Sequence, residues 1–268
     1  MNYIDLTSGD LALAALLLLV NGLISLGFGL RLEASLAAAA VRMVLQLGVL
    51  GFLLKLVFEQ PSPLWTGVAA LAMVAVAGGE LLRRQGHRFR GLYVQGSGHL
   101  LLFAVGALAT LYTLVVIGPT PWYAPRYVMP ILAMVTGGTL ATAGVALQTV
   151  IEGALSERAG IEARMALGAG RFTAFRPLLR RTLQTALTPL FHTMSFAGIA
   201  AMPGVMSGQI LAGADPVAAA KFQILLLCLV TAAAGLGALF AAIAGVLLLT
   251  DRRHRLRLAR LMAQQLAR

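Results

Sequence analysis

Cysteine and acidic residues are scarce in this chain. Its 268 residues include one cysteine, Cys228, and only ten Asp and Glu. A single cysteine excludes a disulfide within the chain. Charged residues make up 12% of the sequence, about half of what a soluble domain carries, whereas 59% of the residues are hydrophobic and the mean hydropathy is +0.85. This composition is typical of a protein that lies in a membrane.

Several functional motifs are also missing. No Gly-x-x-x-x-Gly-Lys-Ser/Thr loop occurs, so ATP hydrolysis is not expected on this polypeptide. Ser97 and His99 have no partner acid in a supporting motif, and we expect the chain not to be an enzyme. The start of the chain contains Asp5 and Asp10 but no Lys or Arg before the first apolar run. It therefore lacks the basic start of a signal peptide, and we expect it to be a mature membrane span.

Seven long apolar segments dominate what remains. They cover about residues 11–30, 34–58, 64–82, 98–117, 127–151, 183–201 and 216–249. A helix of about 20 apolar residues is long enough to cross a bilayer. Hydrocarbon cannot satisfy backbone polar groups, so repeated runs of this length favour helices. The sequence predicts an all-α, polytopic bundle of about seven spans that forms a single transmembrane domain over residues 1–268.

The basic residues predict how this bundle is oriented. Most of them fall in the loops on one side of a seven-span arrangement: Arg31, Arg83, Arg84, Arg88, Arg90, Arg158, Arg164, Arg171, Arg176, Arg180, Arg181, Arg252, Arg253, Arg255, Arg257, Arg260 and Arg268. The other side has Lys55, Arg126 and Lys221. By the positive-inside rule the crowded side is cytoplasmic, with the N-terminus outside and the C-terminus inside. The net charge of +11 does not indicate nucleic-acid binding, because the arginines lie between spans and not along one soluble face.

Residues 152–182 form the one long stretch that is too charged for hydrocarbon. Its apolar residues still recur at helical spacing, as Ile161 and Met165 do, which predicts an amphipathic helical pair on a membrane surface or against a partner. Within it, Glu162 and Ala163 precede Gly168, and this glycine predicts a turn at the helix end. A Glu-Ala pair followed by a glycine at this spacing resembles the short cytoplasmic signature of ABC-transporter permeases, which implies docking into a cleft of an ATPase. The alternative is an ordinary amphipathic helix at the membrane surface.

Residues 202–216 interrupt the apolar pattern a second time. Pro203, Gly204, Gly208 and Gly213 are poor choices for a continuous helix, so we expect a broken helix that lines a cavity or meets protein. Asp215 and Pro216 are typical of an N-cap and a first-turn proline that open the last span. The alternative is an ordinary extracytoplasmic loop.

Residues 203–224 contain the run Pro-Gly-x-Met-Ser-Gly, Ala-Gly-x-Asp-Pro and Lys-Phe-Gln-Ile. Together with residues 161–169 and 130–144, this run resembles the FetB-like family of iron-export ABC permeases. That family has plant relatives linked to aluminium tolerance. The resemblance is clearest over residues 130–224. One departure is Gly138, where the family often has an asparagine.

The resemblance implies a permease subunit in the bacterial plasma (inner) membrane, embedded in the bilayer, which forms a homodimer and pairs with a separate ATP-binding subunit. ATP and Mg would bind to that partner, and this chain would hold no cofactor. The resemblance assigns ATPase coupling to Glu162, Ala163, Leu167, Gly168 and Ala169. We expect the broken segment at residues 202–216 to gate or line the pathway, through Pro203, Gly204, Met206, Ser207, Gly208, Gln209 and Asp215.

Polar side chains inside spans are a further group of candidates. Arg42 and Gln46 share one helical face, Glu80 lies near the end of the third span, and His192 lies in the sixth. A charge in the bilayer centre costs about 2.5–3.5 kcal/mol on insertion scales, so such residues are usually paired or functional. We expect Glu80 to neutralise Arg42. A rival function follows from the same residues: a secondary transporter or channel for an ion or small solute that uses Arg42, Glu80 and His192.

Metal ligands and a subunit contact are only weakly indicated. Met202, Met206 and His192 are the candidate ligands, although methionine is common filler between helices and His192 has the alternative of a bond to a neighbouring carbonyl. The spacing of these residues in the sequence does not define a metal site. Gly237, Ala241 and Gly245 share one face of the last span and permit close helix approach, either inside the chain or between two copies.

Overall fold

The computed structural model describes residues 7–59, 62–84, 87–89, 115–251, 255–256 and 261–263. Its helices are α1 (Ser8–Gly27), α2 (Glu33–Glu59), α3 (Pro63–Arg84), α5 (Pro125–Ser156), α6 (Arg158–Ala166), α7 (Arg171–Phe196), α8 (Gly204–Leu211) and α9 (Pro216–Leu249). Two three-residue strands, β1 (His87–Phe89) and β2 (Leu261–Ala263), complete the described elements. The chain divides into two compact units, Met1–Gln60 and Pro61–Arg268.

The first unit is a hairpin of α1 and α2. Thr7 caps α1 in a capping box with Asp10. At the turn, Gly29 and Arg31 have positive φ angles of 62° and 56°. The buried Ser25 hydroxyl donates to the Glu33 carboxylate at 2.9 Å and accepts from the Leu32 N–H at 3.0 Å. These bonds end α1 three residues before the predicted boundary at residue 30.

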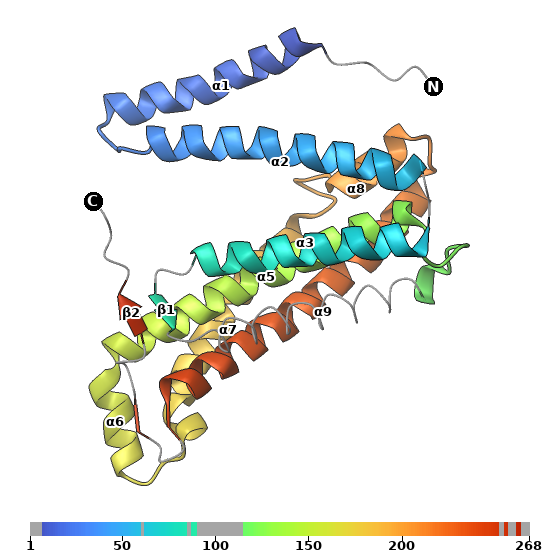
Figure 1. Ribbon diagram of the computed structural model, residues 1–268. Coiled ribbons are helices and arrows are strands. Elements are labelled where there is room, and N and C mark those ends of the chain that lie inside the picture. The colour runs from blue at the N-terminus through green and yellow to red at the C-terminus, as the bar shows by residue number, and fades with distance from the viewer. Residues whose placement is uncertain are drawn as a thin grey trace. The chain divides into compact units, whose positions relative to one another are not determined.

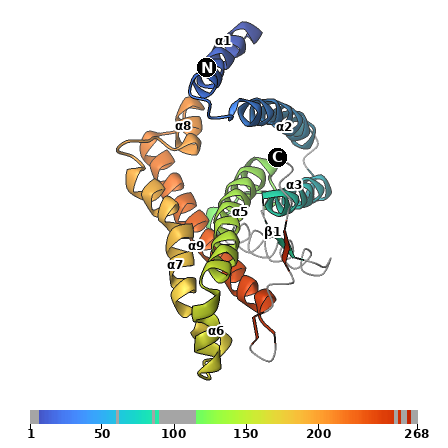
Figure 2. The same ribbon diagram turned by 90° about the vertical axis from the view of Figure 1, so that its left-hand side faces the viewer.

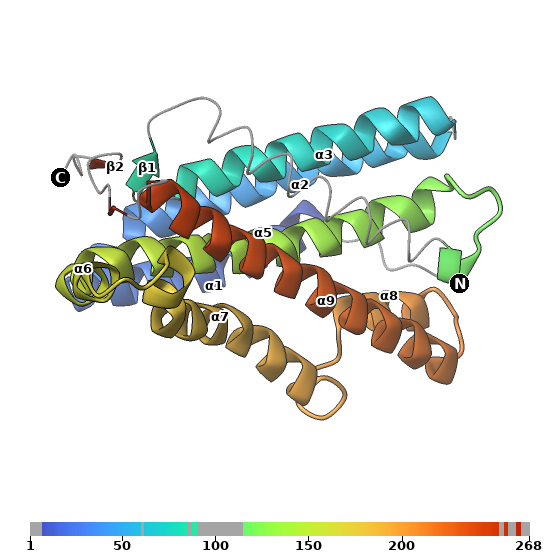
Figure 3. The ribbon, with the colours of Figure 1, turned by 90° about the horizontal axis from the view of Figure 1, so that it is seen from below.

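The second unit is built around α5 and α9, which cross in the view of Figure 3 and share buried clusters from Ile131 and Leu226 to Ala154 and Leu249. Glycines let the two backbones approach closely. A Cβ atom on Gly237 would overlap the Thr139 side chain, and one on Gly138 would lie 2.8 Å from Val230 Cγ1. The buried Thr142 hydroxyl then reaches across to the Ala234 carbonyl at 2.9 Å.

The face of small residues predicted on the last span is used within this interface. Gly245 lies opposite Val150, where a Cβ atom would be 3.0 Å from Val150 Cγ1. Ala241 packs against the buried Ala143 and Ala146 of α5. For these positions the structure shows packing inside the chain.

Within the second unit α3, α5 and α9 run in one direction and α7 runs in the other (Figure 1). The end where α5 and α9 finish and α7 begins is called the polar end here. β1 follows α3 and pairs antiparallel with β2, which follows α9, with Arg88 opposite Met262. The loop after α3 and the C-terminal tail therefore meet, as expected if both lie on one side of a membrane.

Four described helices have the length and apolar composition to cross a membrane: Gly9–Gly27, Glu33–Glu59, Pro125–Ser156 and Pro216–Leu249. A shorter apolar stretch, Pro63–Ala77, lies in α3. The predicted fourth span at residues 98–117 lies outside the described residues apart from its last three.

The predicted boundary between the polar segment and the sixth span is wrong. We expected a surface helical pair up to residue 182 and a separate span over 183–201. Instead α7 is one helix from Arg171 to Phe196, and it is not among the four apolar helices. The backbone hydrogen-bond ladder of a helix continues regardless of side-chain polarity, so the change from charged to apolar residues does not mark its end.

Candidate functional site

At the polar end, α6 forms a corner between α5 and α7 (Figure 2). The side chains of Ile161 and Phe175 are fully buried beneath it. They belong to one cluster drawn from four helices: Val150, Ile151, Ala154, Ile161, Ala174, Phe175, Leu178, Ala242, Val246 and Leu249. Burial of an aromatic or aliphatic side chain contributes about 1.5–3 kcal/mol. The corner is therefore a packed part of the bundle and not a loose loop.

Polar contacts fix the corner further. Arg181 of α7 pairs with Glu157, the residue between α5 and α6, at 2.9 Å. Arg164 of α6 donates from Nη1 to the carbonyl oxygen of Ala174. Gly153 of α5 faces Leu178 so closely that a Cβ atom would overlap it. A displacement of α6 is expected to move the start of α7 with it.

The outer face of α6 carries the predicted coupling residues. Glu162 is exposed and pairs with Arg158 one turn earlier at 2.9 Å. Such exposed pairs within a helix contribute little, about 0.3–0.5 kcal/mol, so the carboxylate can exchange its partner. Ala163 is exposed as well, and the Leu167 side chain is 88% exposed. A large apolar side chain with this exposure at a helix end is available for a protein contact.

Gly168 ends α6 as the sequence predicts. Its φ angle is 89°, a region that favours glycine. The Gly168 N–H bonds to the Met165 carbonyl at 3.0 Å, and the Ala169 N–H bonds to the Arg164 carbonyl at 3.0 Å. These two bonds define a Schellman motif, which satisfies the free carbonyls at a helix end. Ala169 then packs against the corner cluster.

At the other end of α7 the chain turns and forms α8, a helix of eight residues between α7 and α9 (Figure 2). Gly213 closes it with a φ of 91°, and the Gly213 and Ala214 N–H groups bond to the Ile210 and Gln209 carbonyls, each at 2.9 Å. Asp215 caps α9 by accepting from the Ala218 N–H at 2.9 Å, and Pro216 is the first residue of the helix. The predicted N-cap is confirmed.

The predicted pathway residues lie on and around α8. Pro203 is its N-cap residue, and the Ser207 hydroxyl donates to the Pro203 carbonyl at 3.2 Å. Gly204 and Gly208 are exposed, whereas Met206, Ser207 and Gln209 are half-buried. The structure brings these residues together in one element. Their role in a pathway stays a prediction.

Gln223 of α9 has a role that the sequence did not reveal. Its side chain is buried, and its Oε1 accepts from the Met206 N–H at 3.3 Å, which fastens the start of α8 to α9. The first N–H groups of a helix have no partner within the helix, so a buried acceptor here satisfies one of them. A glutamine in an apolar span is the signal that could have indicated it.

The polar residues predicted to lie inside spans belong to three different helices, α2, α3 and α7. Arg42 is half-buried and Gln46 exposed, both on α2 in the first unit. The side chain of Glu80 lies outside the described residues, so its pairing with Arg42 stays a prediction. His192 is exposed on α7, with its ring 6.4 Å from the Phe196 ring, centroid to centroid.

Metal ligation stays equally open. Within the described ranges no three His, Cys, Asp or Glu side chains gather in one place. Met202 is exposed ahead of α8 and Met206 lies on it, while His192 belongs to α7. The neighbouring Met194 accepts a hydrogen bond from the Thr231 hydroxyl at 3.1 Å, which joins α7 to α9. That contact is structural in character.

The described fold is a helical bundle with four helices long and apolar enough to cross a membrane, joined to an exposed polar corner at α6. Residues 8–248 match the model of the uncharacterised protein family UPF0014, and the chain belongs to this family.

Relatives of known name align over most of the chain. Protein ALUMINUM SENSITIVE 3 of Arabidopsis thaliana is 32% identical over 223 residues, which are 83% of this chain and 80% of the relative. UPF0014 membrane protein STAR2 of Oryza sativa is 34% identical over 198 residues, 74% and 68% of the two chains. "Probable iron export permease protein FetB" of Escherichia coli is 30% identical over 241 residues, 90% and 91% of the two chains. No solved structure matches the chain.

Proposed function

We propose that this chain is the membrane-spanning subunit of an ATP-driven transporter that exports iron or a related metal. A separate ATP-binding subunit would bind ATP and Mg and drive it, and two copies of this chain would form the transport unit in the bacterial plasma membrane. The single observation that carries the proposal is the corner at α6. It is packed into the bundle on one face and presents Glu162, Ala163 and the 88% exposed Leu167 on the other.

The mechanism follows from how the corner is connected. Closure of the ATP-binding subunits would push on α6, and the contacts of Arg164 and Arg181 would pass the displacement to the start of α7. Because α7 is continuous to Phe196, the displacement would reach the segment that holds α8. Two arrangements of α7 and α8, biased by nucleotide on the partner, are the minimum that such a transport cycle needs.

The metal assignment rests on the relative from Escherichia coli, which is named a probable iron export permease protein. Fe²⁺ accepts carboxylate and imidazole ligands, and thioethers suit softer metals. The candidates in this chain for transient contact with the cargo are Met202, Met206 and His192. Export requires weak, exchangeable contacts, so a preformed metal cage is not part of the proposal.

A pull-down from detergent-solubilised membranes tests the coupling role. Wild-type protein is expected to retain an ATP-binding protein, and Leu167→Glu is expected to reduce its recovery at least tenfold, because a charge would replace an apolar contact. The matched control is Ile199→Glu, which changes a side chain that is 91% exposed at the other end of α7. Equal losses in both variants, or no ATP-binding protein with the wild type, would contradict the proposal.

Liposomes separate this proposal from the rival secondary transporter. The purified chain alone is expected to move no metal against a gradient, and addition of the ATP-binding subunit with ATP is expected to start transport. Transport by the chain alone in response to an ion gradient, abolished by Arg42→Gln or His192→Gln, would establish the rival instead.

A further inference from the structure

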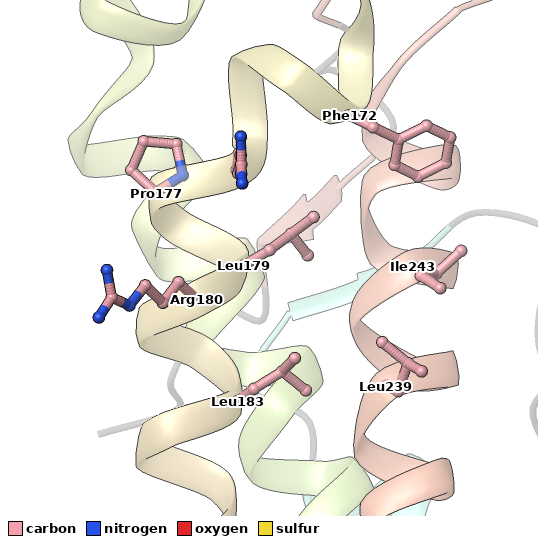
Figure 4. Close-up of a pocket in the computed structure, with 8 residues that line it drawn as sticks. Phe172, Pro177, Leu179, Arg180, Leu183, Leu239 and Ile243 are labelled. Carbon is pink, nitrogen blue, oxygen red and sulfur yellow. The ribbon is translucent and has the colours of Figure 1, made fainter.

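A groove runs between α7 and α9 near the polar end of the second unit (Figure 4). Its residues are Phe172, Arg176, Pro177, Leu179, Arg180 and Leu183 from α7, with Leu239 and Ile243 from α9. The groove is open on one side. Phe172 and Leu239 are 43% and 38% exposed. In a membrane protein such an apolar surface meets either lipid or another protein.

Two arginines make this groove chemically distinct. Arg176 and Arg180 are one helical turn apart on α7, so their charges share one side of the helix. Like charges at this spacing repel each other and destabilise a helix. No ion pair or hydrogen bond involves either side chain within the described part of the chain.

The carboxylates at the end of α5 and on α6 already have partners. Glu157 pairs with Arg181, and Glu162 pairs with Arg158. Glu152 accepts a hydrogen bond from the Gln148 amide at 2.8 Å. The charge of the groove is therefore left for an anion that comes from outside the described residues.

The order of groups along the groove indicates what that anion is attached to. Going from the polar end into the bundle, Arg176 and Arg180 lie about 8 and 14 Å from the start of α7 at a rise of 1.5 Å per residue. Leu183 lies one turn further, and Leu239 faces it from α9. A ligand that fits has an anionic head near the membrane surface and an apolar tail that points toward the membrane centre.

We propose that the α7–α9 groove binds one bilayer phospholipid with an anionic headgroup. Its phosphate accepts from the guanidinium group of Arg176 and from that of Arg180, whose exposed side chain points away from α9 in Figure 4 and turns toward the bound lipid, and one acyl chain covers the apolar lining that includes Leu183 and Leu239. Guanidinium groups suit phosphate because they donate two parallel hydrogen bonds. The bound lipid would neutralise the two arginine charges and fill the space beside α7, the helix that the proposed function expects to move. The inference is independent of ATP and of metal export.

Native mass spectrometry of the purified full chain tests this site directly. The protein is equilibrated with equal amounts of phosphatidylglycerol and phosphatidylcholine, and retained lipids are counted. Wild type is expected to keep one phosphatidylglycerol. In Arg176→Gln/Arg180→Gln the preference for phosphatidylglycerol over phosphatidylcholine is expected to fall about 25-fold, because each basic residue near an anionic surface contributes about fivefold.

Matched variants make the result specific. Arg126→Gln/Arg158→Gln removes two charges outside the groove and is expected to leave the preference unchanged. Leu239→Trp fills the apolar part without a change of charge and is expected to weaken retention of the same lipid. Equal retention of the two lipids by the wild type, or equal losses in both double variants, would overturn the proposal.

A second copy of the chain is the competing occupant. In a Cys228→Ser background, Leu239→Cys in membranes is expected to stay uncrosslinked under mild oxidation, because a lipid separates it from other protein. A disulfide-linked dimer formed in high yield would assign the groove to a subunit contact and would overturn the lipid site.

Discussion

At the scale of single residues, the turns of this protein depend on a few backbone positions. Gly168 and Gly213 each end a short helix with a positive φ angle and the same pair of hydrogen bonds. Asp215 begins α9 directly afterwards. These features follow from local chemistry, and the sequence predicts the cap at Asp215 and the turn at Gly168 for that reason.

Gly168→Ala tests the turn at the end of α6. The new methyl group would meet no atom within 4 Å, so the change acts only through the φ angle of 89°. We expect a local cost of about 1–2 kcal/mol, seen as faster hydrogen exchange of the α6 amides. Gly160→Ala, inside the same helix, is the control and is expected to stabilise α6 by up to about 1 kcal/mol, which slows the exchange of its amides. The same sign for both variants would contradict the assignment.

Asp215→Ala tests the start of α9. Loss of the bond to the Ala218 N–H is expected to cost about 0.5–2 kcal/mol, again as faster exchange of the first α9 amides. Asp215→Asn keeps a side-chain oxygen in the same place and is expected to retain nearly all of the protection. If Asn exchanges as fast as Ala, the side chain does not act as a cap.

At the scale of elements, contacts between helices fix features of the fold that sequence patterns do not predict. Thr142 bonds to Ala234, 92 residues away, and Gln223 bonds to Met206 on a different helix. No local pattern specifies such partners. The polarity of residues 171–182 also indicated a helix boundary that the structure does not have, because α7 continues through it. The apolar length of α9, in contrast, predicted its bounds.

Gly237→Val tests the close approach of α5 and α9. A side chain here would overlap Thr139, so we expect the free energy of unfolding to fall by about 1–3 kcal/mol. Gly235→Val introduces the same side chain where nothing lies within 4 Å. Thermal unfolding in detergent is expected to show a lower midpoint for the first variant only. Equal midpoints would mean that the two helices do not pack through Gly237.

At the scale of the whole molecule, the proposed orientation places the α6 corner in the cytosol and the turn after α7 outside. The pairing of β1 with β2 is consistent with β1, after α3, and β2, in the C-terminal tail, lying on the same side of the membrane. Family membership supports a membrane protein, whereas the proposed direction of insertion rests on the distribution of arginines alone.

Single cysteines measure this orientation. In a Cys228→Ser background, Leu167→Cys and Ile199→Cys place thiols on side chains that are 88% and 91% exposed. A membrane-impermeant maleimide is expected to label Ile199→Cys in intact cells or spheroplasts and Leu167→Cys only after the membrane is opened. Labelling of both from the same side would exclude a membrane crossing by α7.

Under the proposed function, the length of α7, a single helix with Pro177 and Pro189 inside it, sets the scale of the transport movement. Its 26 residues span about 39 Å at 1.5 Å per residue, and a helix neither stretches nor shortens appreciably. A rotation of only about 5° around one end would therefore sweep the opposite end through about 3.4 Å, close to the width of a water molecule. Under the proposed function, a small rotation at the α6 corner would therefore displace the α8 end of the helix by about the width of one water molecule.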